Sequence, residues 1–255
     1  MLENPELGLI AIGVIMAIIN LIPVPGFLVI IAIVILAYLA FPALHLERSI
    51  QRKYWLDVYL KSNSPIYVFL KKRTQIINIF SLFASLLFGV IAYISICHFS
   101  LFECMLIVCS LWAAFQFDSL IASQIDSHAS FNVASILRVR TFYFVAGVLV
   151  LFSLVAAGFF GNFSLDYSEK TADQLASEVI ASCKHPCDYV RHYVRTLHYC
   201  ELQLLRVRDI VGFPLGWIIY IFFLIPNILP AFAITAVYLG INIRIKQIQE
   251  QNGSL

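Results

Sequence analysis

Residues 7–44 have the sequence LGLIAIGVIMAIINLIPVPGFLVIIAIVILAYLAFPAL and contain no Lys, Arg, Asp, Glu or His. An uncharged apolar run of about eighteen residues already predicts a membrane span, so this run is too long for one ordinary span. Pro23 and Pro25 lie near its middle, and proline removes a backbone donor and clashes with the preceding helical turn. The stretch therefore predicts membrane sequence that is folded back or kinked at its centre.

The composition independently supports a membrane protein. Apolar residues make up 61% of the 255 residues and charged residues 13%, with a mean hydropathy of +0.87, whereas soluble domains carry about 25% charged residues. Glu3 and Glu6 precede the apolar run and no Lys or Arg does, so the basic start of a cleaved signal peptide is missing. We expect the run to be retained as membrane structure.

Four further apolar runs predict membrane segments, at 76–98, 104–122, 142–161 and 212–241. We therefore expect an all-α, polytopic transmembrane helix bundle of about six segments, two of them broken by proline. The expected organisation is an N-terminal membrane hairpin over 1–44, a basic cytoplasmic segment over 45–75, transmembrane helices over 76–161, a polar helical hairpin outside the bilayer over 162–211, and a proline-broken segment with a tail over 212–255.

The basic residues predict the orientation of these segments. The 45–75 stretch holds Arg48, Arg52, Lys53, Lys61, Lys71, Lys72 and Arg73. By the positive-inside rule this stretch is cytoplasmic. Counting crossings then places residues 99–103 outside, Arg138 and Arg140 inside, and the 162–211 loop outside. Because the basic residues flank apolar segments, orientation explains them and the net charge of +2 does not indicate nucleic-acid binding.

Whether the 104–122 segment crosses the membrane decides this topology, because the charged Asp118 lies near its end. Its length suffices for roughly 28 Å of helix, which favours a crossing. If it does not cross, the 162–211 loop becomes cytoplasmic and the last segment folds as a hairpin.

Pro226 and Pro230 repeat the proline pair within the last apolar run. Each pair predicts a kink or break that frees backbone carbonyls at membrane depth. Proline-interrupted segments in the two halves of a chain are typical of transporters whose binding site lies where the breaks meet. Such a site would use Asn20, Asp118 and Asn227. Proline is also frequent in ordinary membrane helices, which favours kinks that only shape the bundle.

Asp118 can be interpreted in two ways. An ionisable residue inside the membrane is a functional hypothesis by default, and proton or cation coupling would suit it. If the apolar helix ends at Phe117, however, Asp118 only caps its boundary in headgroup water.

Small residues predict how the helices pack. Ser81, Ser85 and Gly89 follow one another at four-residue steps, and so do Ser153, Ala157 and Gly161. Such stripes let helix backbones approach closely in a membrane. We expect them to pack within the chain rather than against another subunit.

The 162–211 loop contains a concentration of cysteine and histidine. Its members are Cys183, His185, Cys187, His192, His198 and Cys200. If 186–210 is one helix, Cys187 and Cys200 lie about 20 Å apart, too far for a disulfide or a shared metal. The spacing leaves inert thiols or a disulfide between Cys183 and Cys187 as the favoured interpretations, and a metal site as the less favoured one.

The sequence contains no phosphate-binding loop, dinucleotide fingerprint, zinc-protease motif or serine-hydrolase motif. We therefore expect a non-catalytic membrane protein without a cofactor, whose partners are the lipid bilayer and another membrane protein, and not nucleic acid. The leading hypothesis is an accessory, assembly or regulatory component of a bacterial cytoplasmic membrane, acting through helix contacts and its polar hairpin. The alternative is a small permease or channel.

Overall fold

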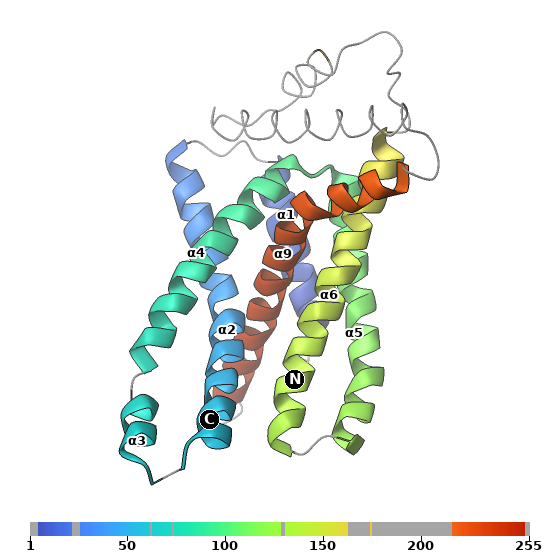
Figure 1. Cartoon of the computed structure of the whole chain (residues 1–255). Helices are drawn as coiled ribbons and strands as arrows, with labels where there is room; N and C mark the ends of the chain where they lie inside the picture. Colours follow the sequence, from blue (N-terminus) through green and yellow to red (C-terminus); the bar gives the residue numbers. More distant parts are fainter. Residues whose placement is uncertain are drawn as a thin grey trace.

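The computed structural model describes residues 5–21, 26–61, 63–72, 74–128, 131–162, 174 and 216–252. These residues are almost entirely helical and include no strand, which confirms the predicted all-α class. The helices are α1 (Pro5–Leu21), α2 (Gly26–Tyr59), α3 (Pro65–Lys72), α4 (Thr74–His98), α5 (Leu101–His128), α6 (Phe131–Asn162) and α9 (Gly216–Asn252). All except the short α3 and the first part of α9 run roughly along one bundle axis (Figure 1).

The bundle has the dimensions of an integral membrane protein. Within the described residues, five helices are long and apolar enough to cross a bilayer: α2, α4, α5, α6 and α9. The seventeen-residue α1 is apolar but shorter, and its length of about 25 Å lies at the lower limit for a span. Large apolar side chains such as Ile30, Phe83 and Phe152 are exposed on the outer surface, as expected of lipid-facing positions.

The N-terminal apolar run forms two helices, because α1 ends at Leu21 and α2 begins at Gly26. Pro23 and Pro25 lie between them, outside the described residues. The two helices run in opposite directions (Figure 1), but α1 packs chiefly against α5, α9 and α4. The run is thus folded back as predicted, and other helices separate its two arms.

The last apolar run has the kink that its prolines predict, and not the break. The helix α9 continues from Gly216 to Asn252 through both Pro226 and Pro230. Figure 1 shows a bend, with the first part of α9 (orange) lying across the top of the bundle and the remainder descending. Proline is tolerated in this way where neighbouring helices and polar side chains satisfy the freed backbone groups. Because α9 does not reverse, the hairpin alternative for this segment is wrong.

The 104–122 segment forms part of α5, which runs from Leu101 to His128 and packs against α6 and α1. Ser100 caps its start: the Ser100 hydroxyl accepts from the Glu103 backbone N–H at 3.2 Å, and the Glu103 carboxylate accepts from the Ser100 N–H at 2.6 Å. The charge at Asp118 does not end the helix. The structure therefore favours the crossing model over its alternative.

The expected boundary at residue 45 has no counterpart in the backbone, because α2 is continuous across it. Leu46, Ile50, Tyr54 and Val58 belong to the lower end of this helix. Only α3 forms a separate short helix in the 45–75 stretch.

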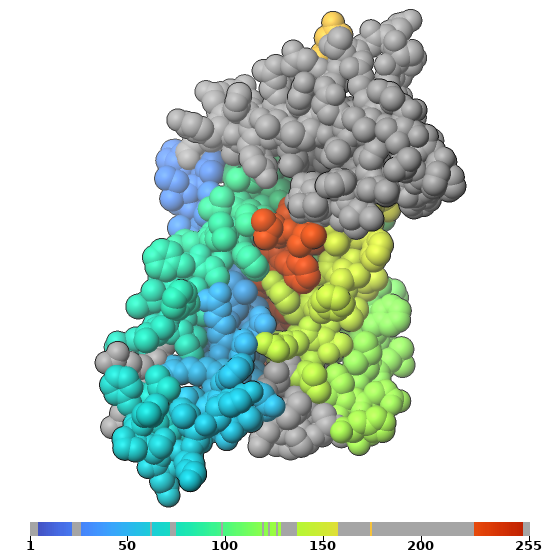
Figure 2. All heavy atoms as spheres, in the orientation of Figure 1, coloured from blue at the N-terminus to red at the C-terminus, as the bar shows by residue number. Residues whose placement is uncertain are grey.

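The small-residue stripe of α4 packs within the chain, as the sequence predicts, and its partner is α2. Ser81, Ser85 and Gly89 are buried. A methyl group at Gly89 would lie 2.8 Å from the Ile33 carbonyl oxygen and 2.9 Å from the Ala37 nitrogen. At the core, Gly240 of α9 lies so close to α2 that a methyl group would overlap the Leu39 carbonyl. Figure 2 shows how little of α9 (red) is visible on this face between its neighbours.

Candidate functional site: a polar layer at one end of the bundle

Polar side chains in the apolar part of the bundle join helices. The Ser110 hydroxyl on α5 is hydrogen-bonded to the Ser153 hydroxyl on α6. The Tyr143 hydroxyl on α6 donates to the Phe232 carbonyl on α9 at 3.1 Å. Thr235 is fully buried and donates to the Ala231 carbonyl of its own helix at 2.8 Å. The Ser110–Ser153 and Tyr143–Phe232 hydrogen bonds stabilise helix packing, as polar side chains commonly do in membranes, whereas that of Thr235 stays within α9.

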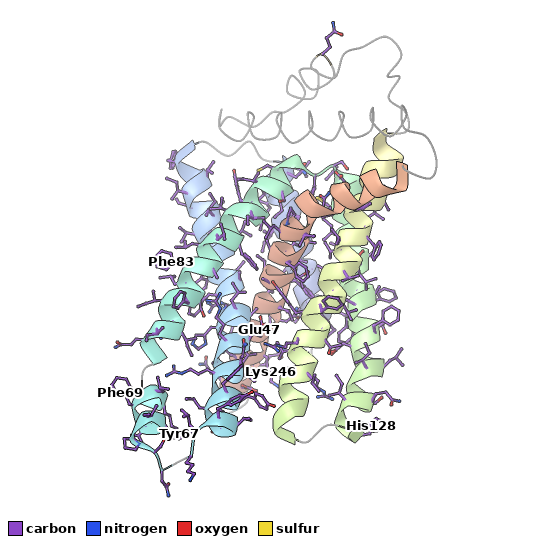
Figure 3. The ribbon with its side chains drawn as sticks, viewed as in Figure 1. Glu47, Tyr67, Phe69, Phe83, His128 and Lys246 are labelled. Carbon is purple, nitrogen blue, oxygen red and sulfur yellow. The ribbon has the colours of Figure 1, made fainter. Side chains whose placement is uncertain are left out.

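Below this apolar part, polar and charged residues from four helices lie at one level, which we call the polar layer. It consists of His45, Glu47 and Arg48 on α2, Asn78 on α4, Arg138 and Arg140 on α6, and Asn242, Arg244 and Lys246 on α9. Glu47 and Lys246 mark it in the lower half of Figure 3.

Three contacts establish that these segments are level. Gly240 on α9 lies beside Leu39 on α2, and both helices descend in Figure 1. The ring centroids of Phe142 on α6 and Tyr238 on α9 are 6.3 Å apart. Arg140 Nε is 3.9 Å from the Glu47 Oε1, which places the start of the ascending α6 beside α2. Because an α-helix rises about 1.5 Å per residue, positions 45–48, 138–140 and 242–246 lie at similar heights.

The contacts within the layer are mixed in strength. His45 Nε2 and Asn78 Oδ1 are 2.9 Å apart and join α2 to α4. The Arg140–Glu47 pair is long and partly exposed, and such pairs contribute about 0–1 kcal/mol. Asn242 is buried, donates to the Tyr238 carbonyl at 2.9 Å, and packs directly on Gly8 of α1. The layer therefore ties α1, α2, α4, α6 and α9 together at one end.

Asp118 lies on α5 at the edge of this layer. Its carboxyl is close enough to Arg138 and Tyr238 for its charge to act on both. This position fits the interpretation of Asp118 as a boundary residue better than that of a charge isolated at membrane depth.

The structure does not bring Asn20, Asp118 and Asn227 together. The Asn20 amide donates to the Ile96 carbonyl at 3.3 Å and to the Phe99 carbonyl, at the upper end of α4. Asp118 lies about 25 Å further along α5, counted from Leu101. Asn227 is half-buried on α9, roughly 16 Å along that helix from Tyr238. The predicted shared permeation site has no support in this geometry.

Other predicted site residues are only partly described. Pro230 is half-buried within α9. Cys183 and Cys187, with the whole of 175–215, lie outside the described residues, so their disulfide stays a prediction. Cys97, Cys104 and Cys109 are free thiols in α4 and α5. Among the residues that the structure describes, no group of three or more His, Cys, Asp or Glu side chains could hold a metal ion.

A second distinctive surface lies beyond the polar layer, at the lower end of α2 and on α3. We call this the aromatic lobe; its exposed apolar residues are Tyr54, Trp55, Val58, Tyr59, Ile66, Val68, Phe69 and Leu70. Trp55 and Tyr59 stack with centroids 4.4 Å apart. The Tyr67 hydroxyl donates to the Asp57 carboxylate at 2.9 Å, which raises the pKa of Tyr67. Figure 3 labels Tyr67 and Phe69 at the bottom of the molecule.

Sequence reasoning interpreted Arg48, Arg138 and Arg140 only as orientation signals on one side of the membrane. Their alignment in one layer was missed, although one signal was present: the apolar parts of α2, α4, α6 and α9 stop at nearly the same height at this end of the bundle. Aligning the ends of antiparallel runs would have gathered Arg48, Arg138 and Arg244 into one layer.

Comparisons with protein-family models, with curated proteins and with solved structures find no match to the chain.

Proposed function

We propose that this chain is a non-catalytic accessory or assembly component of a membrane complex, which acts by holding a partner protein and not by moving a solute. The observation that carries the proposal is the use of the polar side chains in the apolar region. Asn20, Ser110 and Tyr143 each form a hydrogen bond to a neighbouring helix, and Thr235 forms one to a carbonyl of its own helix. All four side chains are thereby engaged within the protein.

The aromatic lobe is the described surface best suited to a partner. From Arg48 to Tyr59, α2 extends about 16 Å past the polar layer. Trp55 and Phe69 are more than half exposed there, and contiguous exposed apolar surface marks a contact site. Lys53, Lys61 and Lys71 are also exposed in this region. The lobe therefore suits a partner segment that combines apolar and acidic side chains. The 162–211 hairpin is a second proposed contact, on the opposite side of the membrane.

The proposed location is a bacterial cytoplasmic membrane, with the polar layer and the aromatic lobe on the cytoplasmic side. The support is the distribution of charge. Arg48, Arg138, Arg140, Arg244 and Lys246 all lie at the same end of the bundle, as the contacts between α2, α6 and α9 place them, and an excess of Lys and Arg near the ends of spans marks the cytoplasmic side.

Site-specific photocrosslinking tests the partner role. We expect a photoreactive phenylalanine analogue at Trp55 or Phe69 to form one discrete protein adduct in native membranes. The same analogue at Phe83, an exposed position on α4 (Figure 3), should react only with lipid. Lipid adducts alone at all three positions would contradict the proposal.

Asp118→Asn separates this role from the permease alternative. The substitution removes the charge while keeping the shape of the side chain, so a scaffold should keep its full yield of the Trp55 adduct. A proton-coupled permease would lose its flux. Loss of solute uptake in Asp118→Asn cells with an unchanged adduct yield would favour the permease, and would overturn the non-transport part of the proposal.

A further inference from the structure

We propose that the cations of the polar layer bind the phosphate group of an acidic membrane lipid, with Arg244 as the principal contact. We call these cations the basic collar: Arg48, Arg138, Arg140, Arg244 and Lys246. The inference concerns lipid and does not depend on a partner protein.

The basic collar carries more positive than negative charge. Among the described residues, the acids near its level are Glu6 in the first turn of α1, Glu47, which pairs loosely with Arg140, and Asp118 at its edge. Lys246 pairs with Glu250 one turn further along α9 at 3.7 Å. A basic cluster at the end of membrane spans attracts the anionic lipids of the adjacent leaflet.

Two guanidinium groups of the collar have a buried nitrogen atom without a hydrogen-bond partner in the part of the chain that the structure describes. Arg48 Nη1 and Arg244 Nε are buried and have no hydrogen-bond partner among the described residues. A buried polar group without a partner is destabilising. Such a placement is expected where the remaining donors serve a ligand, and the guanidinium fork matches the geometry of phosphate oxygens.

Arg244 is half-buried and is held beside an exposed residue of α2. Its Nη2 donates to the Tyr38 carbonyl at 3.0 Å, and its guanidinium carbon lies 3.6 Å from the centroid of the Tyr38 ring. Tyr38 is 59% exposed on the outer surface of α2. Stacking on an aromatic ring orients the guanidinium and leaves its other edge available for an anion.

The surface beside Arg244 favours a lipid over free phosphate. Ile31, Val34, Ile35 and Tyr38 are exposed and recur at helical spacing along α2. Together they form an apolar strip that leads along the helix to the Arg244 guanidinium. The acyl chain of a lipid can lie on this strip while the lipid's phosphate binds the Arg244 guanidinium. Inorganic phosphate could bind only through the charge of the guanidinium.

The test measures protection of the purified full chain against thermal unfolding in a neutral detergent, titrated with dioleoyl-phosphatidylglycerol. We expect this lipid to raise the unfolding midpoint in a saturable way, and dioleoyl-phosphatidylcholine or inorganic phosphate to have little effect. Arg244→Gln should raise the half-saturating concentration about fivefold, the factor expected for one basic residue near a membrane surface. Lys61→Gln removes the same charge from an exposed site beyond the collar and should change nothing.

If Arg244→Gln does not fold, the variants Arg244→Lys and Arg48→Gln test the proposal in its place. Arg244→Lys retains the charge without the planar fork and should weaken protection less than Arg244→Gln would. Arg48→Gln should also raise the half-saturating concentration. The proposal fails if phosphatidylcholine or inorganic phosphate protects as well as phosphatidylglycerol, or if the collar variants titrate like Lys61→Gln.

Discussion

Gly240→Ala is expected to destabilise the bundle by about 3 kcal/mol, at the upper end of the usual cost of overpacking. The added methyl group would overlap the Leu39 carbonyl oxygen, and it would lie 2.8 Å from the Leu39 carbonyl carbon and 3.3 Å from the Ala40 Cα. All three are backbone atoms of α2, so no side-chain rotation can make room. The two helices must separate, and the contacts on either side of Gly240 weaken with them.

Gly13→Ala is the matched control for this substitution. A methyl group there would meet only Val108 Cγ2 at 3.8 Å, which is ordinary van der Waals contact. Its effect should stay within about 0.5 kcal/mol. Unfolding of the purified chain in mixed micelles, followed by circular dichroism during titration with a denaturing detergent, measures both variants. Equal stability of the two would show that α2 and α9 do not pack as described.

Gly8→Ala should cost about 2 kcal/mol, and Asn242→Ala should remove most of that cost. A methyl group at Gly8 would collide with the Asn242 side chain, whose Cγ lies 2.7 Å from the added atom. Asn242 is held in place by its hydrogen bond to the Tyr238 carbonyl. Shortening it frees the space that the methyl group needs.

A double-mutant cycle measures this coupling with the same unfolding assay. The coupling energy should exceed about 1 kcal/mol, because the two side chains are in direct contact. Additive effects of the two substitutions would contradict the packing of α1 on α9. That packing distinguishes this bundle from one in which the first two helices form an isolated hairpin.

The sequence predicted features that depend on local pattern. The apolar runs located the helices, and the serine and glycine spacing of α4 identified a face that packs within the chain, which the structure places against α2. Pro23, Pro25 and the residues around them correctly marked a change of helix. In each case the deciding information lies within a few helical turns of the residue concerned.

Features that depend on tertiary contact were missed or misjudged. Pro226 and Pro230 resemble the first pair in sequence, yet α9 continues through them, because the helices around a proline decide whether its freed carbonyls can be satisfied. Asn20 and Asp118 both suggested a polar path. Their separation became visible only when the α4–α5 connection placed Asn20 at one end of the bundle and Asp118 near the other.

The central claim is that α5 crosses the membrane once and that the polar layer lies at its cytoplasmic boundary. Ser100, at the start of α5, and Ser127, near its end, are both exposed and suit single-cysteine labelling in a chain without its native cysteines. We predict that a membrane-impermeant thiol reagent labels Ser100→Cys in intact cells and Ser127→Cys only after permeabilisation. Labelling of both from the same side would show that α5 does not cross, and the reverse pattern would place the polar layer outside; either result contradicts the account.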